Sequence, residues 1–147
     1  MKTVNKSVLI WYSPQEMYVL VTDVAQYPRF LPWCDHAAVT EQDATGMLAE
    51  VGISIGGVRQ TFTTRNTHVV DSQVDMRLVN GPFSQLDGRW NFLPVGDGSH
   101  RACRVELTLN YGFDNAGLSK LVGPVFDKIA ANMVDAFVRR AQQVYGS

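Results

Sequence analysis

The sequence contains few residues of the types that bind metals or act as nucleophiles. Its three histidines, His36, His68 and His100, follow one another at intervals of 32 residues. None belongs to a pair of ligands at the short spacings of common metal sites, such as i, i+4 on a helix or C-x-x-C. The two cysteines, Cys34 and Cys103, are too few for a disulfide framework. We therefore predict no metal site and two free, buried thiols.

Arginines are the second group of residues that could bind a partner. Between residues 59 and 106, charged residues alternate with apolar ones and so share one face of strand-like segments. The charged residues are Arg59, Arg65, Arg77, Arg89 and Arg104, interleaved with Asp75, Asp87 and Glu106. This pattern is typical of a solvated sheet face whose charges pair across strands. It also fits contact with RNA phosphates, which the fork of arginine suits, so both interpretations stay open.

Composition restricts the class of protein further. The 147 residues are enough for a sizeable core, and we expect a single domain over residues 1–147. With 13 Lys and Arg against 14 Asp and Glu, no global field favours DNA or an anionic membrane. The sequence shows no signal-peptide pattern and no apolar run of about 20 residues. We expect no membrane span and a cytoplasmic location.

The first part of the chain predicts one strand followed by two short helical segments. Period-two alternation predicts the strand over residues 2–11. Ser13, Pro14 and Glu16 match a capping box that begins a short amphipathic helix. The segment 27–34 is rich in aromatic residues and holds two prolines, so at most one helical turn fits between them. Its aromatic side chains either cover the core or line the mouth of a cavity.

Six further strands are predicted where alternating segments are divided by turn signals. They lie near residues 37–43, 46–55, 58–69, 73–80, 85–94 and 101–111. The turn signals include Gly56-Gly57 and Asp71-Ser72, and their shortness predicts an antiparallel meander.

The face opposite the charged residues is almost wholly apolar. Its polar side chains are Gln60, Thr64, Asn66, His68, Asn80 and the hydroxyl of Tyr111. Catalysis would need acid or base groups with adjusted pKa values on this face. We therefore predict no catalytic residue, and we interpret His68 as a structural histidine.

Residues 116–145 predict a long amphipathic helix, because large apolar residues recur at spacings of three and four. They are Leu118, Leu121, Val122, Val125, Phe126, Ile129, Met133, Val134, Phe137 and Val144. Gly123-Pro124 predicts an interruption, with a short piece over 116–122 and a main helix that begins at Pro124. The apolar sheet face must cover this stripe. The elements predict an α+β fold in which a seven-stranded curved antiparallel sheet wraps a long C-terminal helix, with two short helices after the first strand.

Four segments carry a resemblance to a known family. They are Tyr27-Pro28-Arg29-Phe30-Leu31-Pro32-Trp33-Cys34, Phe62-Thr63-Thr64-Arg65-Asn66, the stretch from Leu78 to Phe92, and Ala130 to Phe137. With the order of elements, they resemble the START-like superfamily of polyketide cyclases, dehydrases and lipid transport proteins. Within it, the chain is similar to the coenzyme Q-binding protein and ribosome association toxin family. The resemblance implies a helix-grip (START-like, Bet v-like) fold with a cavity between sheet and helix.

The resemblance implies three functions. The uncharged inner face favours the first, non-enzymatic binding of a hydrophobic ligand, a ubiquinone-type quinone, in support of respiratory electron transport. Apart from this bound ubiquinone, no cofactor is expected. The second is a ribosome association toxin of a toxin–antitoxin pair, which binds the large ribosomal subunit and blocks subunit joining, with Arg59, Arg77 and Arg89 as contact residues. The third is a polyketide cyclase or dehydrase.

The expected ligand site is apolar, and the amide of Asn66 or that of Gln60 is able to bind a quinone carbonyl. The residues predicted to line it are Phe62, Asn66, Met76, Phe83, Trp90, Phe92, Leu107, Met133 and Phe137.

Overall fold

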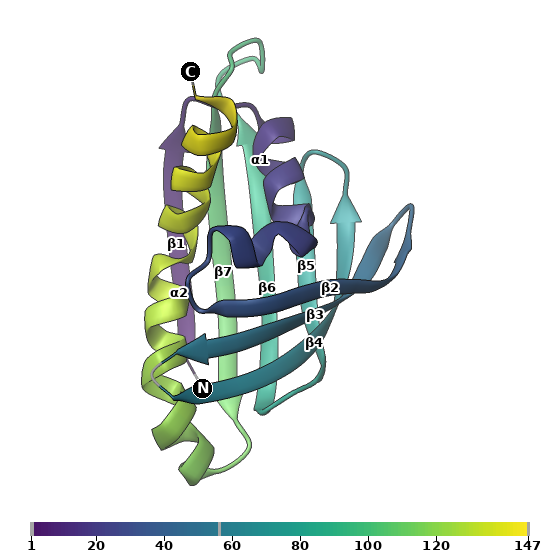
Figure 1. Cartoon of the computed structure of the whole chain (residues 1–147). Coiled ribbons are helices and arrows are strands. Elements are labelled where there is room, and N and C mark those ends of the chain that lie inside the picture. Colours follow the sequence, from purple (N-terminus) through teal and green to yellow (C-terminus); the bar gives the residue numbers. More distant parts are fainter. Residues whose placement is uncertain (1, 56, 147) are drawn as a thin grey trace.

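A seven-stranded antiparallel sheet holds a long helix against one of its faces in the computed structural model, which describes residues 2–55 and 57–146 (Figure 1). The elements in chain order are β1 (Lys2–Ile10), α1 (Pro14–Thr22), η1 (Val24–Arg29), β2 (Cys34–Asp43), β3 (Gly46–Ile55), β4 (Val58–Val69), β5 (Gln73–Asn80), β6 (Phe83–Pro94), β7 (Cys103–Phe113) and α2 (Ala116–Tyr145). Strands β2 to β7 form a meander, and β1 completes the sheet beside β7. The predicted α+β helix-grip arrangement is confirmed. Of the turn predicted at Gly56-Gly57, Gly56 lies outside the described residues.

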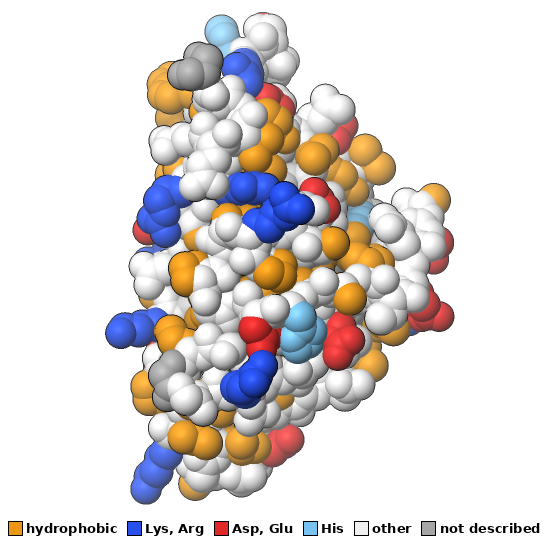
Figure 2. Space-filling view, viewed as in Figure 1, with side chains coloured by type: hydrophobic (Ala, Val, Ile, Leu, Met, Phe, Trp, Pro, Cys, Tyr) orange, Lys and Arg blue, Asp and Glu red, His pale blue; other side chains and the backbone are white. Residues whose placement is uncertain are grey.

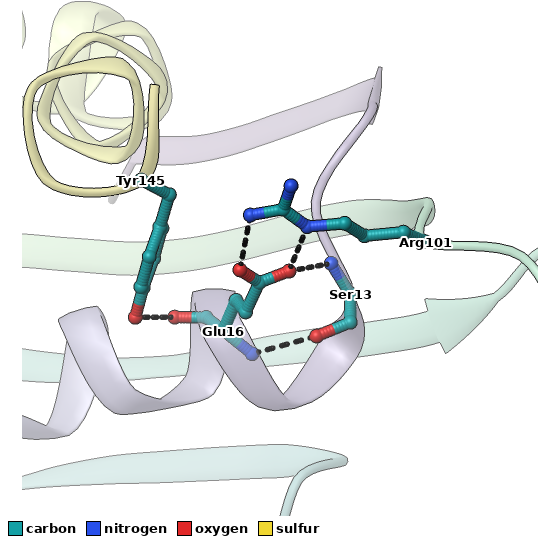
Figure 3. Close-up of polar contacts among 4 residues, drawn as sticks. All are labelled: Ser13, Glu16, Arg101 and Tyr145. Carbon is teal, nitrogen blue, oxygen red and sulfur yellow. Dashed lines mark hydrogen bonds and ion pairs between the residues drawn. The ribbon is translucent and has the colours of Figure 1, made fainter. Parts of the chain in front are cut away.

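The start of α1 is fixed by the predicted capping box. The Ser13 hydroxyl accepts a hydrogen bond from the Glu16 N–H at 3.1 Å, and the Glu16 carboxylate accepts one from the Ser13 N–H at 2.9 Å. Arg101 donates two further hydrogen bonds to the same carboxylate, at 2.9 and 2.6 Å. The Tyr145 hydroxyl donates to the Glu16 carbonyl at 3.0 Å (Figure 3). Glu16 therefore links the first turn of α1, the loop before β7 and the last turn of α2.

The sheet is strongly curved because its strand pairing is irregular. β5 pairs with β6 only over Gln73–Arg77, and the pairing of β4 with β5 shifts register at Thr63/Thr64. Two further shifts lie between β2 and β3. Register shifts of this kind bend a strand and increase its twist. Figure 1 shows the result, with β2–β4 running across the direction of β5–β7 and the concave side facing α2.

The helix α2 is continuous, so the interruption predicted at Gly123-Pro124 is wrong. The Asn115 side chain caps it by accepting a hydrogen bond from the Leu118 N–H, and Pro124 lies inside it. A proline inside a helix costs about 3 kcal/mol. Here the ring of Pro124 is exposed, and the flanking Val122 and Phe126 are buried against the sheet. Their burial, worth roughly 1.5–3 kcal/mol each, offsets the lost hydrogen bond.

Two residues predicted on the apolar stripe of α2 face solvent instead. Leu121 is 58% exposed and Val144 is 47% exposed. Leu121 precedes Val122 and so lies about 100° around the helix from the buried line that starts there. Val144 falls in the last turn of α2. The buried stripe is therefore narrower than the sequence predicts.

A buried tyrosine ties α2 to the sheet. Tyr111 of β7 is 1% exposed, and its hydroxyl donates a hydrogen bond to Asp127 of α2 at 2.5 Å. Lys2 of β1 forms an ion pair with the same carboxylate. Burial alone would raise the pKa of Asp127, but the hydrogen bonds from Lys2 and Tyr111 outweigh it and hold that pKa below its usual value. The Tyr111 hydroxyl thus serves a structural contact.

We predict that Glu16→Gln destabilises the protein by about 1–2 kcal/mol at neutral pH, because it removes the carboxylate from the cap and from its exposed partner Arg101. The hydrogen bonds from Arg101 are the main reason why the pKa of Glu16 falls from 4.5 to about 2. A carboxyl whose pKa falls on folding stabilises the native state above its ordinary pKa, and this contribution disappears as the pH drops through the folded value. Urea unfolding should show the difference from wild type shrinking from pH 4.5 toward pH 2.

The control for this measurement is Glu106→Gln. Glu106 lies on β7 and forms no ion pair with any described residue. A difference between wild type and Glu16→Gln that stays constant over this pH range would contradict the assigned role of Glu16.

Candidate functional site

A cavity of about 70 Å³ lies between the concave face of the sheet and α2. Its wall comes from β3 and β4 on one side, from β5, β6 and β7 on another, from the region of η1, and from one face of α2. The cavity is smaller than the roughly 300–1,000 Å³ of typical ligand sites. At this volume the cavity can hold a few atoms, but not a quinone ring with an isoprenoid tail.

Most of the residues predicted to line a cavity do line this one. They are Phe62, Asn66, Met76, Trp90, Leu107, Met133 and Phe137. Phe83 and Phe92 are the two predicted residues that are not part of the wall. Both are buried near the ends of β6, where Phe83 packs on Phe126 at 4.9 Å between ring centroids and Phe92 stacks on Trp90 at 6.2 Å. The cavity lies at the middle of β6, so these rings support the wall from either end.

Ten residues of the cavity wall are not among the predicted lining residues. They are Val24, Tyr27, Trp33, Ala49, Val51, Thr64, Leu86, Leu109, Phe126 and Ile129. The sequence pattern could have identified most of them, since the strand residues alternate on the inner face and those of α2 recur with helical spacing. For the aromatic segment 27–34, the sequence predicts that the side chains either cover the core or line the mouth of a cavity. The structure shows both, because Tyr27 and Trp33 line the cavity while Phe30 packs on Phe137 at 5.2 Å.

A glycine lets two wall side chains pack closely on the backbone at the middle of the sheet. Gly88 occupies the inner-face position of β6 between Leu86 and Trp90. A Cβ added there would lie 2.8 Å from the Met76 Cε and 2.9 Å from the Leu109 Cδ1. The neighbouring side chains therefore lean over Gly88, and no side chain rises from the sheet at that point.

Two buried polar residues of β4 face the cavity. Thr64 is 5% exposed and Asn66 is 7% exposed, and the Thr64 hydroxyl donates a hydrogen bond to the Asn66 Oδ1 at 2.8 Å. Within the described residues, the Asn66 Nδ2 donates no hydrogen bond. Since an amide nitrogen carries two N–H donors, this group is available to an acceptor inside the cavity.

The remaining polar residues predicted on the inner face do not line the cavity. Asn80 is exposed, because β5 is no longer paired with β6 at that point. His68 packs edge-on against Tyr18 at 6.0 Å between ring centroids, and burial lowers its pKa. Gln60 is half-buried outside the wall. These positions leave Thr64 and Asn66 as the polar pair of the site.

The wall contains no carboxylate, amine, guanidinium, imidazole or thiol among the described residues. Tyr27 supplies a phenol, but its hydroxyl already donates to the Val21 carbonyl at 2.5 Å, and burial raises its pKa. Across residues 2–55 and 57–146, no three metal-ligating side chains are grouped closely enough to hold an ion. In the same residues, neither helix has both the length and the apolar character of a membrane span. The site suits an apolar molecule that presents one hydrogen-bond acceptor.

The arginines predicted as contact residues lie on the convex face of the sheet, away from α2. Arg89 donates two hydrogen bonds to Asp75, at 2.7 and 3.0 Å, and Arg59 pairs with Asp35 at 2.9 Å. Arg77 forms no ion pair with a described residue. Two of these three charges are therefore already neutralised by a carboxylate.

Comparison with known proteins assigns the chain to a family. The model of the family described as polyketide cyclase / dehydrase and lipid transport matches residues 10–138, which include the strands β2 to β7 and most of α2. The chain belongs to this family.

Relatives of the chain have names of different kinds. The chain is 43% identical over 146 residues to a protein of Vibrio cholerae named ribosome association toxin RatA, with 99% of each chain covered. It is 27% identical over 143 residues to the mitochondrial coenzyme Q-binding protein COQ10 homolog B of Xenopus laevis. This match covers 97% of this chain and 59% of that protein. The names describe those two proteins.

Solved structures share the fold at low sequence identity. A START superfamily protein of Mycobacterium smegmatis has a TM-score of 0.76 at 18% identity, with 97% of this chain and 98% of that chain covered. The ZhuI aromatase/cyclase of Streptomyces sp. R1128 has a TM-score of 0.82 at 14% identity, with 97% and 94% covered. The START-like fold is therefore retained in proteins of very different sequence.

We predict that Thr64→Val destabilises the protein by about 1–3 kcal/mol, because it leaves the buried Asn66 Oδ1 without a donor. The double variant Thr64→Val/Asn66→Leu should recover most of this loss, since it replaces both partners with apolar groups. Urea unfolding of the two single variants and the double variant measures the coupling between the sites. Strictly additive effects would show that the two side chains do not act as a pair.

Proposed function

We propose that this chain associates with the large ribosomal subunit in the cytoplasm and acts there by binding rather than by catalysis. The supporting observation is the 43% identity to a ribosome association toxin over 99% of both chains. The START-like fold is retained at 14% and 18% identity, so the fold by itself does not require so much shared sequence. The additional identity favours a shared activity.

The composition of the cavity supports a role without catalysis. Ring closure or dehydration of a polyketide would need an acid or base in contact with the substrate. The wall offers the Thr64–Asn66 pair and the Tyr27 hydroxyl, each already engaged in a hydrogen bond. The cyclase function therefore has the least support of the three.

We predict that the purified protein cosediments with large ribosomal subunits in sucrose gradients and lowers the fraction of joined ribosomes when magnesium is raised. The cavity variant Thr64→Val/Asn66→Leu leaves the surface unchanged, so it should behave like wild type. Subunits that join normally, with the protein remaining at the top of the gradient, would exclude this function.

Binding of a hydrophobic ligand, a ubiquinone-type quinone, is the second candidate function. It is supported by the apolar wall, in which the Asn66 Nδ2 donates no hydrogen bond to a described residue, and by the 27% identity to a coenzyme Q-binding protein. At about 70 Å³ the cavity must widen to admit a quinone ring. Met76 and Met133 are half-buried wall residues whose unbranched side chains can shift most easily. Ligand entry would thus displace side chains between the sheet and α2.

We predict that a short-chain ubiquinone quenches the fluorescence of Trp33 and Trp90, which both line the cavity. Asn66→Leu should weaken binding by about 3–10-fold, because a neutral hydrogen bond contributes roughly 1 kcal/mol. Asn91→Leu is the matched control, since Asn91 follows Trp90 on β6 and so points to the opposite face of the sheet. Equal affinities for the two variants would remove Asn66 from the site, and the absence of quenching in wild type would count against a quinone.

A further inference from the structure

Three arginines on the helix side of the molecule carry charges that no carboxylate of residues 2–55 and 57–146 neutralises. Arg29 ends η1, and Arg139 and Arg140 lie in the last third of α2. None of them forms an ion pair with a described residue. Figure 2 shows Lys and Arg side chains gathered at the level where η1 lies beside α2. We call Arg29, Arg139 and Arg140 the helix-side arginines.

An aromatic ring holds part of this cluster in place. The Arg140 guanidinium lies over the Phe30 ring, 5.0 Å from its centroid. Phe30 follows Arg29 directly and packs on Phe137 and Tyr27, with centroids 5.2 and 6.0 Å away. A guanidinium stacked on a ring keeps its N–H donors at its edge. Arg140 is therefore oriented beside the end of η1 with donors available to an anion.

The acidic residues nearest in sequence do not cancel the cluster. Asp23 precedes η1, and Asp135 lies one helical turn before Arg139 in α2. Both are exposed, and neither pairs with a helix-side arginine. The patch is therefore locally positive, although the whole chain has a net charge of −1.

The convex face of the sheet presents a different environment to an anion. Asp75 occupies one edge of the Arg89 guanidinium, through Nε and Nη2, and Asp35 pairs with Arg59. A phosphate that approached Arg59 or Arg89 would have to displace a carboxylate and would be repelled by it, whereas Arg77 forms no ion pair with a described residue. The helix-side arginines impose neither cost.

We infer that the helix-side arginines form the surface that contacts RNA phosphates. This inference rests on the proposed association with the ribosome, and it assigns the contact to the face of η1 and α2 instead of the convex face of the sheet. Arginine suits this partner because its planar fork donates two parallel hydrogen bonds to a phosphate.

The test compares two variants that lose the same charge. Arg29→Gln/Arg139→Gln/Arg140→Gln changes the helix side, and Arg59→Gln/Arg77→Gln/Arg89→Gln changes the convex face. Affinity for purified large subunits, and for their RNA after removal of the proteins, is measured over a range of potassium chloride concentrations. The helix-side variant should bind at least about tenfold more weakly, and its salt dependence should fall by about 0.7–0.9 per lost phosphate contact. The convex-face variant should bind like wild type.

A second helix-side variant covers the case in which the triple variant is unstable. Arg29→Gln/Arg139→Gln leaves the Arg140–Phe30 stack intact and should show about two-thirds of the change in salt dependence. Arg140→Lys, which keeps the charge but loses the fork, should lie between wild type and the triple variant.

The outcomes separate this inference from the function on which it rests. A wild-type protein that binds no large subunits overturns the proposed function and the inference together. Wild-type binding that is lost only in the convex-face variant overturns the inference and leaves the function in place. Loss in the helix-side variant without a change in salt dependence, or without binding to the isolated RNA, would indicate a ribosomal protein as the partner and overturn the assignment to RNA.

Discussion

The structure depends on the burial of one face of α2 in the concave side of the sheet. Val122 and Ala130 of this helix are fully buried, and Phe137 is nearly so. The sheet alone would expose its apolar face, and the helix alone would expose its stripe, so neither is stable without the other. Polar contacts fix the two ends of the packing, through Asp127 with Tyr111 and Lys2 near one end and through Tyr145 with Glu16 at the other.

The same packing leaves space at its centre. The irregular pairing of β4 with β5 bends the sheet, and the cavity lies between this bent sheet and α2. Gly88 adds no side chain there, and Met76 and Met133 occupy the space without closing it. The Thr64–Asn66 pair is the polar part of a site that is otherwise apolar. A ligand of matching chemistry would complete the core.

The charges are arranged differently on the two sides of the molecule. On the convex face, Arg59, Arg65 and Arg89 each pair with a carboxylate, whereas Arg77 and Arg104 form no ion pair with a described residue. On the helix side, the helix-side arginines remain unpaired among the described residues. This side is also continuous with the cavity, because Arg140 lies over Phe30, Phe30 packs on Phe137, and Phe137 lines the cavity wall. The packed rings of Phe30 and Phe137 therefore connect the candidate RNA surface with the candidate ligand site.

The sequence by itself determined the elements, their order and the side of each that is buried. The capping box at Ser13 and Glu16, the turn at Asp71-Ser72 and the alternation of β3 and β4 all depend on residues close together in the chain. Local spacing also predicted seven of the seventeen residues of the cavity wall, because an inner-face position is inner wherever the strand lies. It failed at Pro124, where packing against the sheet keeps α2 continuous despite the missing donor.

Only the tertiary structure decided how large the cavity is, which polar groups reach it and which arginines are free. Phe83 and Phe92 lie on the inner face as predicted, yet the curvature of the sheet places them at the ends of β6, outside the wall. The sequence does not distinguish the environments of Arg59 and Arg140. In the structure Arg59 forms an ion pair with Asp35 of β2, whereas the Arg140 guanidinium lies over the ring of Phe30, which follows η1. Such contacts join residues that are far apart in the chain. Their geometry depends on the bend of the whole sheet, which no local sequence pattern specifies.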